Sequence, residues 1–166
     1  MKPLAIQWIL NGCGLEAGSI TGGPVRFHEV ARRWRRQAEV TQRLMTTSGG
    51  EGMLRAMGCD LPATTVRAAL LLRREPWRGL RLWSYLLSAA AGRRAAAALP
   101  PCDAAVTVSD YFCDIVPALA LKRRRPTVRW IAWIHHRELP PGSRPGSRLV
   151  NSVTWRLQEW SFRRIA

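Results

Sequence analysis

No stretch of this 166-residue sequence approaches the run of about 18–20 apolar residues that a membrane-spanning helix needs. The first apolar run begins at residue 4, so we expect no secretory signal peptide. Cysteine is scarce, and Cys13, Cys59, Cys102 and Cys113 show no C-x-x-C spacing. We therefore expect free thiols in a cytoplasmic protein, with neither a disulfide framework nor a zinc site.

Acidic residues and lysine are also rare. The chain has 26 Lys and Arg against 11 Asp and Glu, a formal net charge of +15, and only Lys2 and Lys122 are lysines. Positive charge on this scale attracts nucleic acid, phosphosugars or an anionic membrane surface. A GC-rich genome would also enrich Ala, Arg, Gly, Pro and Trp, so composition alone accounts for much of the arginine.

Apolar runs and helical periodicities alternate along the chain. Runs typical of strands cover 4–10, 39–47, 64–67, 104–108 and 128–134, and helical patterns cover 21–34, 51–58, 77–99, 109–121 and 148–166. This alternation predicts one Rossmann-like domain over residues 1–166, a three-layer α/β/α fold with a mainly parallel sheet. The run 128–134 is apolar on both faces apart from Arg129, which predicts a central strand.

Two of the predicted helices have apolar residues on more than one side. The last one carries Val153, Leu157 and Trp160 on a side expected to pack on the sheet, and Trp155 and Phe162 on a side left for a missing domain or partner. The helix over 77–99 is either buried between neighbours or in contact with a bilayer surface, with its arginines at headgroup level.

A glycine pair, Gly22-Gly23, lies at the start of the first helical pattern, after the loop that follows the first apolar run. Phe27, Ala31 and Trp34 belong to one apolar stripe of that helix. Glycines allow the backbone to approach a ligand closely, and the N-terminus of a helix suits phosphate. A plain loop turn is the alternative interpretation. The pattern is not G-x-G-x-x-G, so it does not support a nicotinamide cofactor.

Three predicted strand ends carry polar side chains. They are the segment from Asn11 to Gly23, the pair Ser109-Asp110, and the pair His135-His136. Ligands of open α/β sheets bind beyond the carboxyl ends of the strands, so we expect these segments to converge on one site. The alternatives are a structural histidine pair and a carboxylate that caps a helix, with Ser109 as the N-cap. Two histidines without a third ligand predict no metal site.

At these positions the sequence resembles the N-terminal half of family 4 glycosyltransferases. The matching stretches are 22–34, 39–50, 109–118 and 129–136, in the family's order, and the resemblance extends over almost the whole chain. The resemblance implies one half of a GT-B fold, whose two Rossmann-like domains face each other across a cleft. Such enzymes move a sugar from a nucleotide-sugar donor to an acceptor, usually with retention of configuration. They use the nucleotide sugar as a substrate and need no further cofactor.

The resemblance also implies roles for individual residues. Gly22 and Gly23 match the loop that reaches toward the transferred sugar and the diphosphate. His135 matches the histidine after the fifth strand, near the acceptor and the transferred sugar, and is the candidate catalytic residue. Asn11, Asp110 and His136 are the further candidates for substrate binding.

The family's donor-binding domain, with its Lys/Arg pair and Glu-x7-Glu-like signature, is absent from these 166 residues. We therefore expect the acceptor-side domain of a retaining glycosyltransferase, as a fragment or one subunit, inactive alone and acting on a glycan or lipid-linked acceptor. One alternative is a non-catalytic subunit at the inner face of the membrane that recruits a separate donor-binding chain. A nucleic-acid-binding protein is suggested by charge alone, and the aromatic residues, which lie mostly in apolar runs, argue against it.

Overall fold

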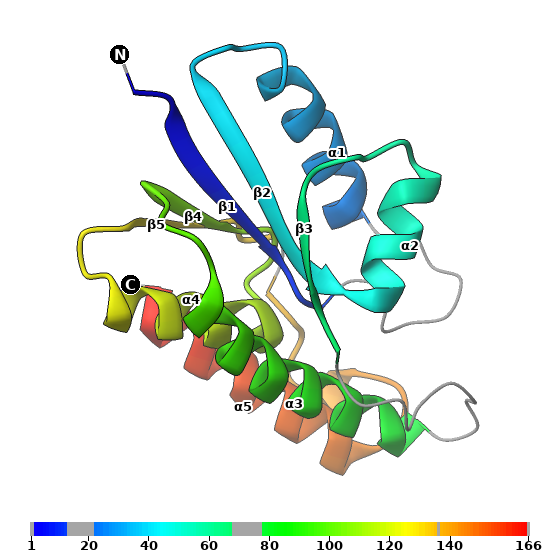
Figure 1. Cartoon of the computed structure of the whole chain (residues 1–166). Helices are drawn as coiled ribbons and strands as arrows, with labels where there is room; N and C mark the ends of the chain where they lie inside the picture. The colour runs from blue at the N-terminus through cyan, green and yellow to red at the C-terminus, as the bar shows by residue number, and fades with distance from the viewer. Residues whose placement is uncertain (1, 13–21, 68–77, 136, 166) are drawn as a thin grey trace.

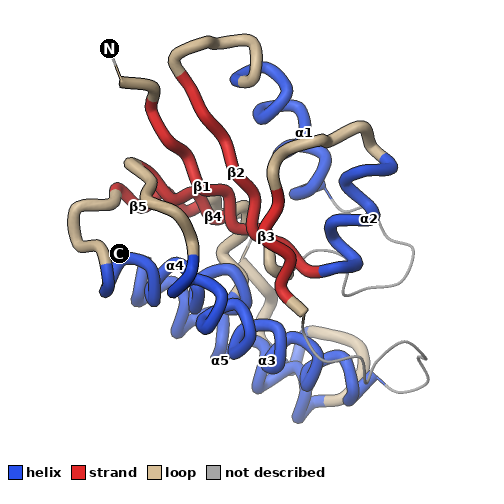
Figure 2. Tube along the Cα trace, in the orientation of Figure 1, coloured by secondary structure: helices blue, strands red, loops and turns tan. Residues whose placement is uncertain are grey.

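The computed structural model describes residues 2–12, 22–67, 78–135 and 137–165. Strands and helices alternate along these residues (Figures 1 and 2). The elements in chain order are β1 (Leu4–Leu10), α1 (Gly22–Trp34), β2 (Val40–Thr47), α2 (Ser48–Ala56), β3 (Ala63–Val66), α3 (Arg78–Ala95), the 3-10 turn η2 (Ala96–Ala98), β4 (Ala104–Thr107), α4 (Phe112–Arg124), β5 (Arg129–Ala132), the 3-10 turn η3 (Pro141–Ser143) and α5 (Arg148–Ile165).

The five strands form one sheet in the order β3-β2-β1-β4-β5, and every neighbouring pair is parallel. Figure 1 shows α1 and α2 on one face of this sheet and α3, α4 and α5 on the other. The predicted Rossmann-like three-layer fold is therefore confirmed. β1 pairs with β2 on one side and with β4 on the other. After β1 the chain therefore continues toward β2, whereas after β4 it continues away from β1, toward β5.

Trp8, on β1, is the centre of the apolar core under α1 and α2. It is fully buried, and its ring centroid lies 5.2 Å from that of Phe27, 5.3 Å from Trp34 and 5.6 Å from Trp133. Its indole N–H donates to Gln42 Oε1 at 2.8 Å, so burial leaves no unpaired donor. Phe27 and Trp34 belong to the stripe predicted for the first helix, which this packing confirms.

β5 differs from its prediction. It runs only from Arg129 to Ala132 and lies at one end of the sheet, so the expectation of a central strand over 128–134 was wrong. Trp130 packs on the α4 side, whereas Ile131 is 49% exposed on the other face. An apolar run indicates that both faces of a strand favour burial. It does not show whether other described residues pack on both faces, and here they leave one face partly exposed.

The second helix begins earlier than its predicted start at residue 51, since α2 starts at Ser48. The Thr47 hydroxyl accepts from the Gly50 backbone N–H at 3.0 Å and so caps the helix. Glu51 lies in the first turn, where the helix dipole favours negative charge. This capping overcomes the low helix propensity of Gly49 and Gly50.

α5 confirms the last predicted helix but not its predicted inner side. Its most buried residues are polar, namely Asn151, Thr154, Gln158 and Ser161. Leu157 and Trp160 are only partly buried, against a cluster formed with α3 and α4. The apolar stripe was expected to pack on the sheet. Instead α5 packs on other helices and on the polar segment that follows β5, so its innermost face is hydrophilic.

Cys59 and Cys102 are free thiols, Cys113 is buried, and Cys13 lies outside the described residues. Burial raises the pKa of the Cys59 and Cys102 thiols, so neither is an activated nucleophile. Within the described ranges, no helix combines the length and the apolar character that crossing a bilayer would take.

Candidate functional site

The carboxyl ends of β1, β4 and β5 bring the predicted site residues together. β1 and β4 are neighbours, and β4 and β5 are neighbours, with all three strands pointing the same way. The residues that follow them are Asn11-Gly12, Val108 to Asp110, and Trp133 to His135. The chain turns to opposite faces after β1 and β4, which is the position where open α/β sheets bind ligands.

His135 is held by its ring and by its backbone. Its Nε2 lies within hydrogen-bonding distance of the Val108 carbonyl oxygen, and its backbone N–H donates to Asp110 Oδ1 at 3.2 Å. A carbonyl oxygen only accepts, so Nε2 carries a proton and the neutral ring has its lone pair on Nδ1. Among the described residues Nδ1 has no hydrogen-bond partner, so it can accept a hydrogen bond from a hydroxyl.

Gly23 lies against the same imidazole. A Cβ atom on Gly23 would be 3.3 Å from His135 Nε2 and 3.9 Å from the Val108 carbonyl oxygen. The start of α1 therefore reaches the histidine, as the sequence predicted, and Gly22 is the first residue of that helix. His136 and the segment 13–21 lie outside the described residues, and the role proposed for His136 stays a prediction.

Asp110 supports His135 rather than capping a helix. Besides the bond from the His135 backbone, its Oδ2 accepts from the Gln158 side-chain amide at 2.7 Å. The carboxylate is 4% exposed. Its contacts are structural, and the prediction that it also touches substrate stays a prediction.

Asn11 is fully buried beneath the site. Its Nδ2 donates to the Ser88 carbonyl at 2.7 Å and to the Cys113 carbonyl at 3.0 Å, while its own carbonyl accepts from Ser88 Oγ at 2.9 Å. These bonds join the end of β1 to α3 and α4. Its Oδ1 has no hydrogen-bond partner among the described residues. Substrate binding by Asn11 stays a prediction, and the contacts assign it a role in anchoring the strand end.

Asp114 fixes the start of the segment that leaves β1. Its Oδ1 accepts from the backbone N–H groups of Asn11 at 2.6 Å and Gly12 at 2.9 Å, and Ser109 Oγ donates to its Oδ2 at 2.6 Å. These three hydrogen bonds lower the pKa of Asp114, but burial raises it by more, to about 7. Ser109 was predicted to cap the helix, and that was wrong, because α4 begins at Phe112 without a side-chain cap.

The site therefore combines one oriented imidazole, a helix start that approaches it closely, and backbone groups held by buried carboxylates. Among the described residues, no three His, Cys, Asp or Glu side chains converge as a metal ion would require. An imidazole whose Nδ1 has no partner among the described residues, at the edge of a parallel sheet, can bind a substrate hydroxyl or exchange a proton with it.

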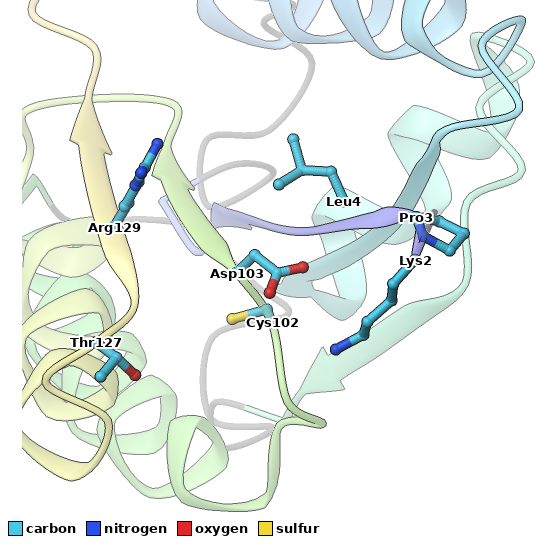
Figure 3. A pocket seen from close by; sticks show the side chains of 7 residues that line it. All are labelled: Lys2, Pro3, Leu4, Cys102, Asp103, Thr127 and Arg129. Atoms are coloured by element: carbon cyan, nitrogen blue, oxygen red, sulfur yellow. The ribbon is translucent and has the colours of Figure 1, made fainter.

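An open cavity of about 470 Å³ lies at the opposite, amino-terminal edge of the sheet (Figure 3). Lys2 and Arg129 lie on either side of it, and Asp103 projects between them. Asp103 Oδ2 already accepts from the Ala5 backbone N–H at 2.8 Å. In Figure 3 the two cationic side chains do not point toward one another, so they do not form a joint anion site.

Sequence reasoning missed Gln158 and the Val108 carbonyl. The signal for Gln158 was its spacing from Asn151, Thr154 and Ser161, which places four uncharged polar residues on one side of the helix. A backbone carbonyl leaves no such signal, because any residue at position 108 would supply it.

No protein-family model matches this chain, and no curated protein is similar enough to it to count as a relative.

Proposed function

We propose that the chain is the acceptor-side domain of a retaining glycosyltransferase that uses a nucleotide sugar as donor. The observation that carries the proposal is the meeting of Gly23, His135 and the Val108 carbonyl at the carboxyl edge of the sheet. It supports a site in which the helix start approaches the donor and the imidazole contacts a sugar or acceptor hydroxyl. The matching sequence stretches supply the reaction class.

In this proposal the chain supplies half of a cleft, and a donor-binding domain in the same or another polypeptide supplies the other half. Holding both reactants in line contributes roughly 7–11 kcal/mol of the barrier, most of which half a cleft forfeits. The acceptor is a glycan or a lipid-linked sugar, and the donor needs no cofactor. The proposed location is the cytoplasm, peripherally at the inner membrane face.

The test measures nucleotide release from a panel of nucleotide sugars, with soluble and lipid-linked acceptors. We expect none from the 166 residues alone and acceptor-dependent release once a donor-binding half is supplied. In that complete enzyme His135→Ala should lower turnover ~10²–10³-fold, the usual loss when one positioned hydrogen-bonding group that stabilises charge in the transition state is removed. The matched control is His28→Ala on α1. Robust release by the isolated chain, or normal turnover without His135, would contradict the proposal.

A second candidate is a non-catalytic subunit that binds the membrane and recruits a donor-binding chain. Trp83 is 62% exposed and Leu87 is 39% exposed, and both lie on one side of α3 with Arg94. An exposed Trp and Leu beside arginine are typical of a helix at an anionic lipid surface. Sedimentation with anionic and neutral vesicles tests this candidate, and equal binding to both would remove its electrostatic part. Tighter binding to DNA than to vesicles would favour a nucleic-acid partner instead.

A further inference from the structure

The buried side of α5 is polar, and it faces the segment that carries His135. Gln158 is 2% exposed and lies at its centre. Its Nε2 donates to Asp110 Oδ2 at 2.7 Å, and its Oε1 accepts from the Glu138 backbone N–H at 2.8 Å. Asp110 in turn accepts from the His135 backbone N–H at 3.2 Å. One amide thus binds the Glu138 backbone directly and the His135 backbone through Asp110.

The orientation of this amide is determined by its partners. A carboxylate accepts hydrogen bonds and cannot donate them, so the NH₂ group must face Asp110. The Glu138 backbone N–H only donates, so the carbonyl oxygen must face it. A flipped amide would break both bonds inside a buried region, where each unpaired polar group is costly. Gln158 can therefore make this pair of contacts in one way only.

We propose that Gln158 is a positioning residue for His135, acting through the carboxylate of Asp110. The functional meaning of this inference rests on the role proposed above for His135. The imidazole reaches the Val108 carbonyl only if the backbone at 135 stays in place, and Asp110 is the side chain that holds this backbone. The bond from Gln158 to Asp110 is charge-assisted, which makes it one of the stronger bonds of the site.

α5 has other attachments that do not involve Gln158. Asn151 Nδ2 donates to the Arg144 carbonyl at 3.2 Å, Arg137 pairs with Glu159 at 2.6 Å, and Leu157 and Trp160 pack against α3 and α4. Loss of the Gln158 amide should therefore release His135 without detaching the helix.

The test is nitrogen-15 NMR of the complete chain at pH 8, in a His136→Asn background so that only His28 and His135 report. Long-range spectra of the imidazole give the tautomer, and hydrogen exchange gives the protection of each backbone N–H. In Gln158→Leu we expect His135 to change from one fixed tautomer to an averaged ring. We also expect its N–H to exchange about tenfold faster or more, as for loss of a hydrogen bond to a charged group.

Two further variants make the result specific. Ser161→Ala is the matched control, because Ser161 is also buried but, among the described residues, its hydroxyl bonds only to the Leu157 carbonyl of its own helix; it should leave His135 unchanged. Gln158→Glu keeps an acceptor for the Glu138 N–H but repels Asp110, so protection at 138 should persist while that at His135 is lost. An unchanged His135 ring and amide in folded Gln158→Leu would overturn the inference. These measurements need no sugar transfer, so a failed transfer assay would refute the proposed function and leave the positioning intact.

Discussion

Replacing Asp114 with Asn should make the protein more stable at neutral and alkaline pH. The buried carboxylate accepts three hydrogen bonds, from Asn11 N, Gly12 N and Ser109 Oγ. Burial nevertheless raises its pKa from 3.8 to about 7. An Asn side chain has nearly the same shape and can still accept both backbone bonds. Its NH₂ group can donate to the Ser109 oxygen, so the substitution removes the buried charge and keeps the contacts.

The sign and size follow from proton binding in the two states. Between pH 4 and pH 7 the folded protein keeps the Asp114 proton that the unfolded chain has lost, so stability falls as pH rises. The slope approaches about 1.4 kcal/mol per pH unit. From pH 5 to pH 7 the free energy of unfolding of the wild type should fall by up to about 2.7 kcal/mol relative to that of Asp114→Asn. The full effect, reached above pH 7, is at most about 4 kcal/mol.

The assay is urea unfolding at pH 5, 6, 7 and 8, followed by tryptophan fluorescence. The other carboxylates titrate alike in both proteins, so the difference between the two curves isolates Asp114. Asp103→Asn is the control, because Asp103 also accepts from a backbone N–H but is exposed; its curve should parallel the wild type. If instead the wild type gains stability relative to Asp114→Asn as pH rises, the hydrogen bonds outweigh burial and the reasoning is refuted.

Three further predictions concern glycines and the exposed side of α3. Gly92→Ala would place a Cβ 2.5 Å from Asn11 Nδ2 and should lower the free energy of unfolding, measured in urea, by about 1–3 kcal/mol. Gly52→Ala, whose Cβ would have no atom within 4 Å, should instead stabilise α2 by up to about 1 kcal/mol. Similar values for the two variants would contradict the packing. Gly23→Ala should shift the His135 ring signals while the melting temperature changes by only a few degrees, and unaltered ring signals would count against the contact. Trp83→Ala should weaken binding to anionic vesicles, and salt should weaken it further, whereas Leu149→Ala, at an even more exposed position, should not; equal losses would place the contact elsewhere.

Local pattern was a good guide to the elements near the centre of the fold. The apolar run in β1 and the helical spacing of Phe27, Ala31 and Trp34 are properties of adjacent residues, and each predicted its element correctly. The same reasoning placed three strand ends at one edge, and the hydrogen bond from His135 to Asp110 joins two of them. The family resemblance and the reaction class remain predictions.

The errors came where a residue's environment depends on distant parts of the chain. β5 is apolar enough for a central strand, but its place at the edge is decided by how the other strands are ordered. The error at Ser109 is local instead: α4 begins at Phe112, so the Ser109 hydroxyl lies before the helix, where it accepts from the Tyr111 backbone N–H and donates to Asp114 Oδ2.

The sequence by itself determined the alternation of strands and helices, the excess of arginine and the residues available at the strand ends, because these depend on side-chain type and local spacing. Only the tertiary structure decided which of those residues meet. It buried Asn11 and Asp114, turned the polar side of α5 inward, and joined Gln158 to His135 through Asp110. Hydrogen bonds between residues up to about a hundred positions apart have no local signature, since they arise when the packed layers bring those groups within reach.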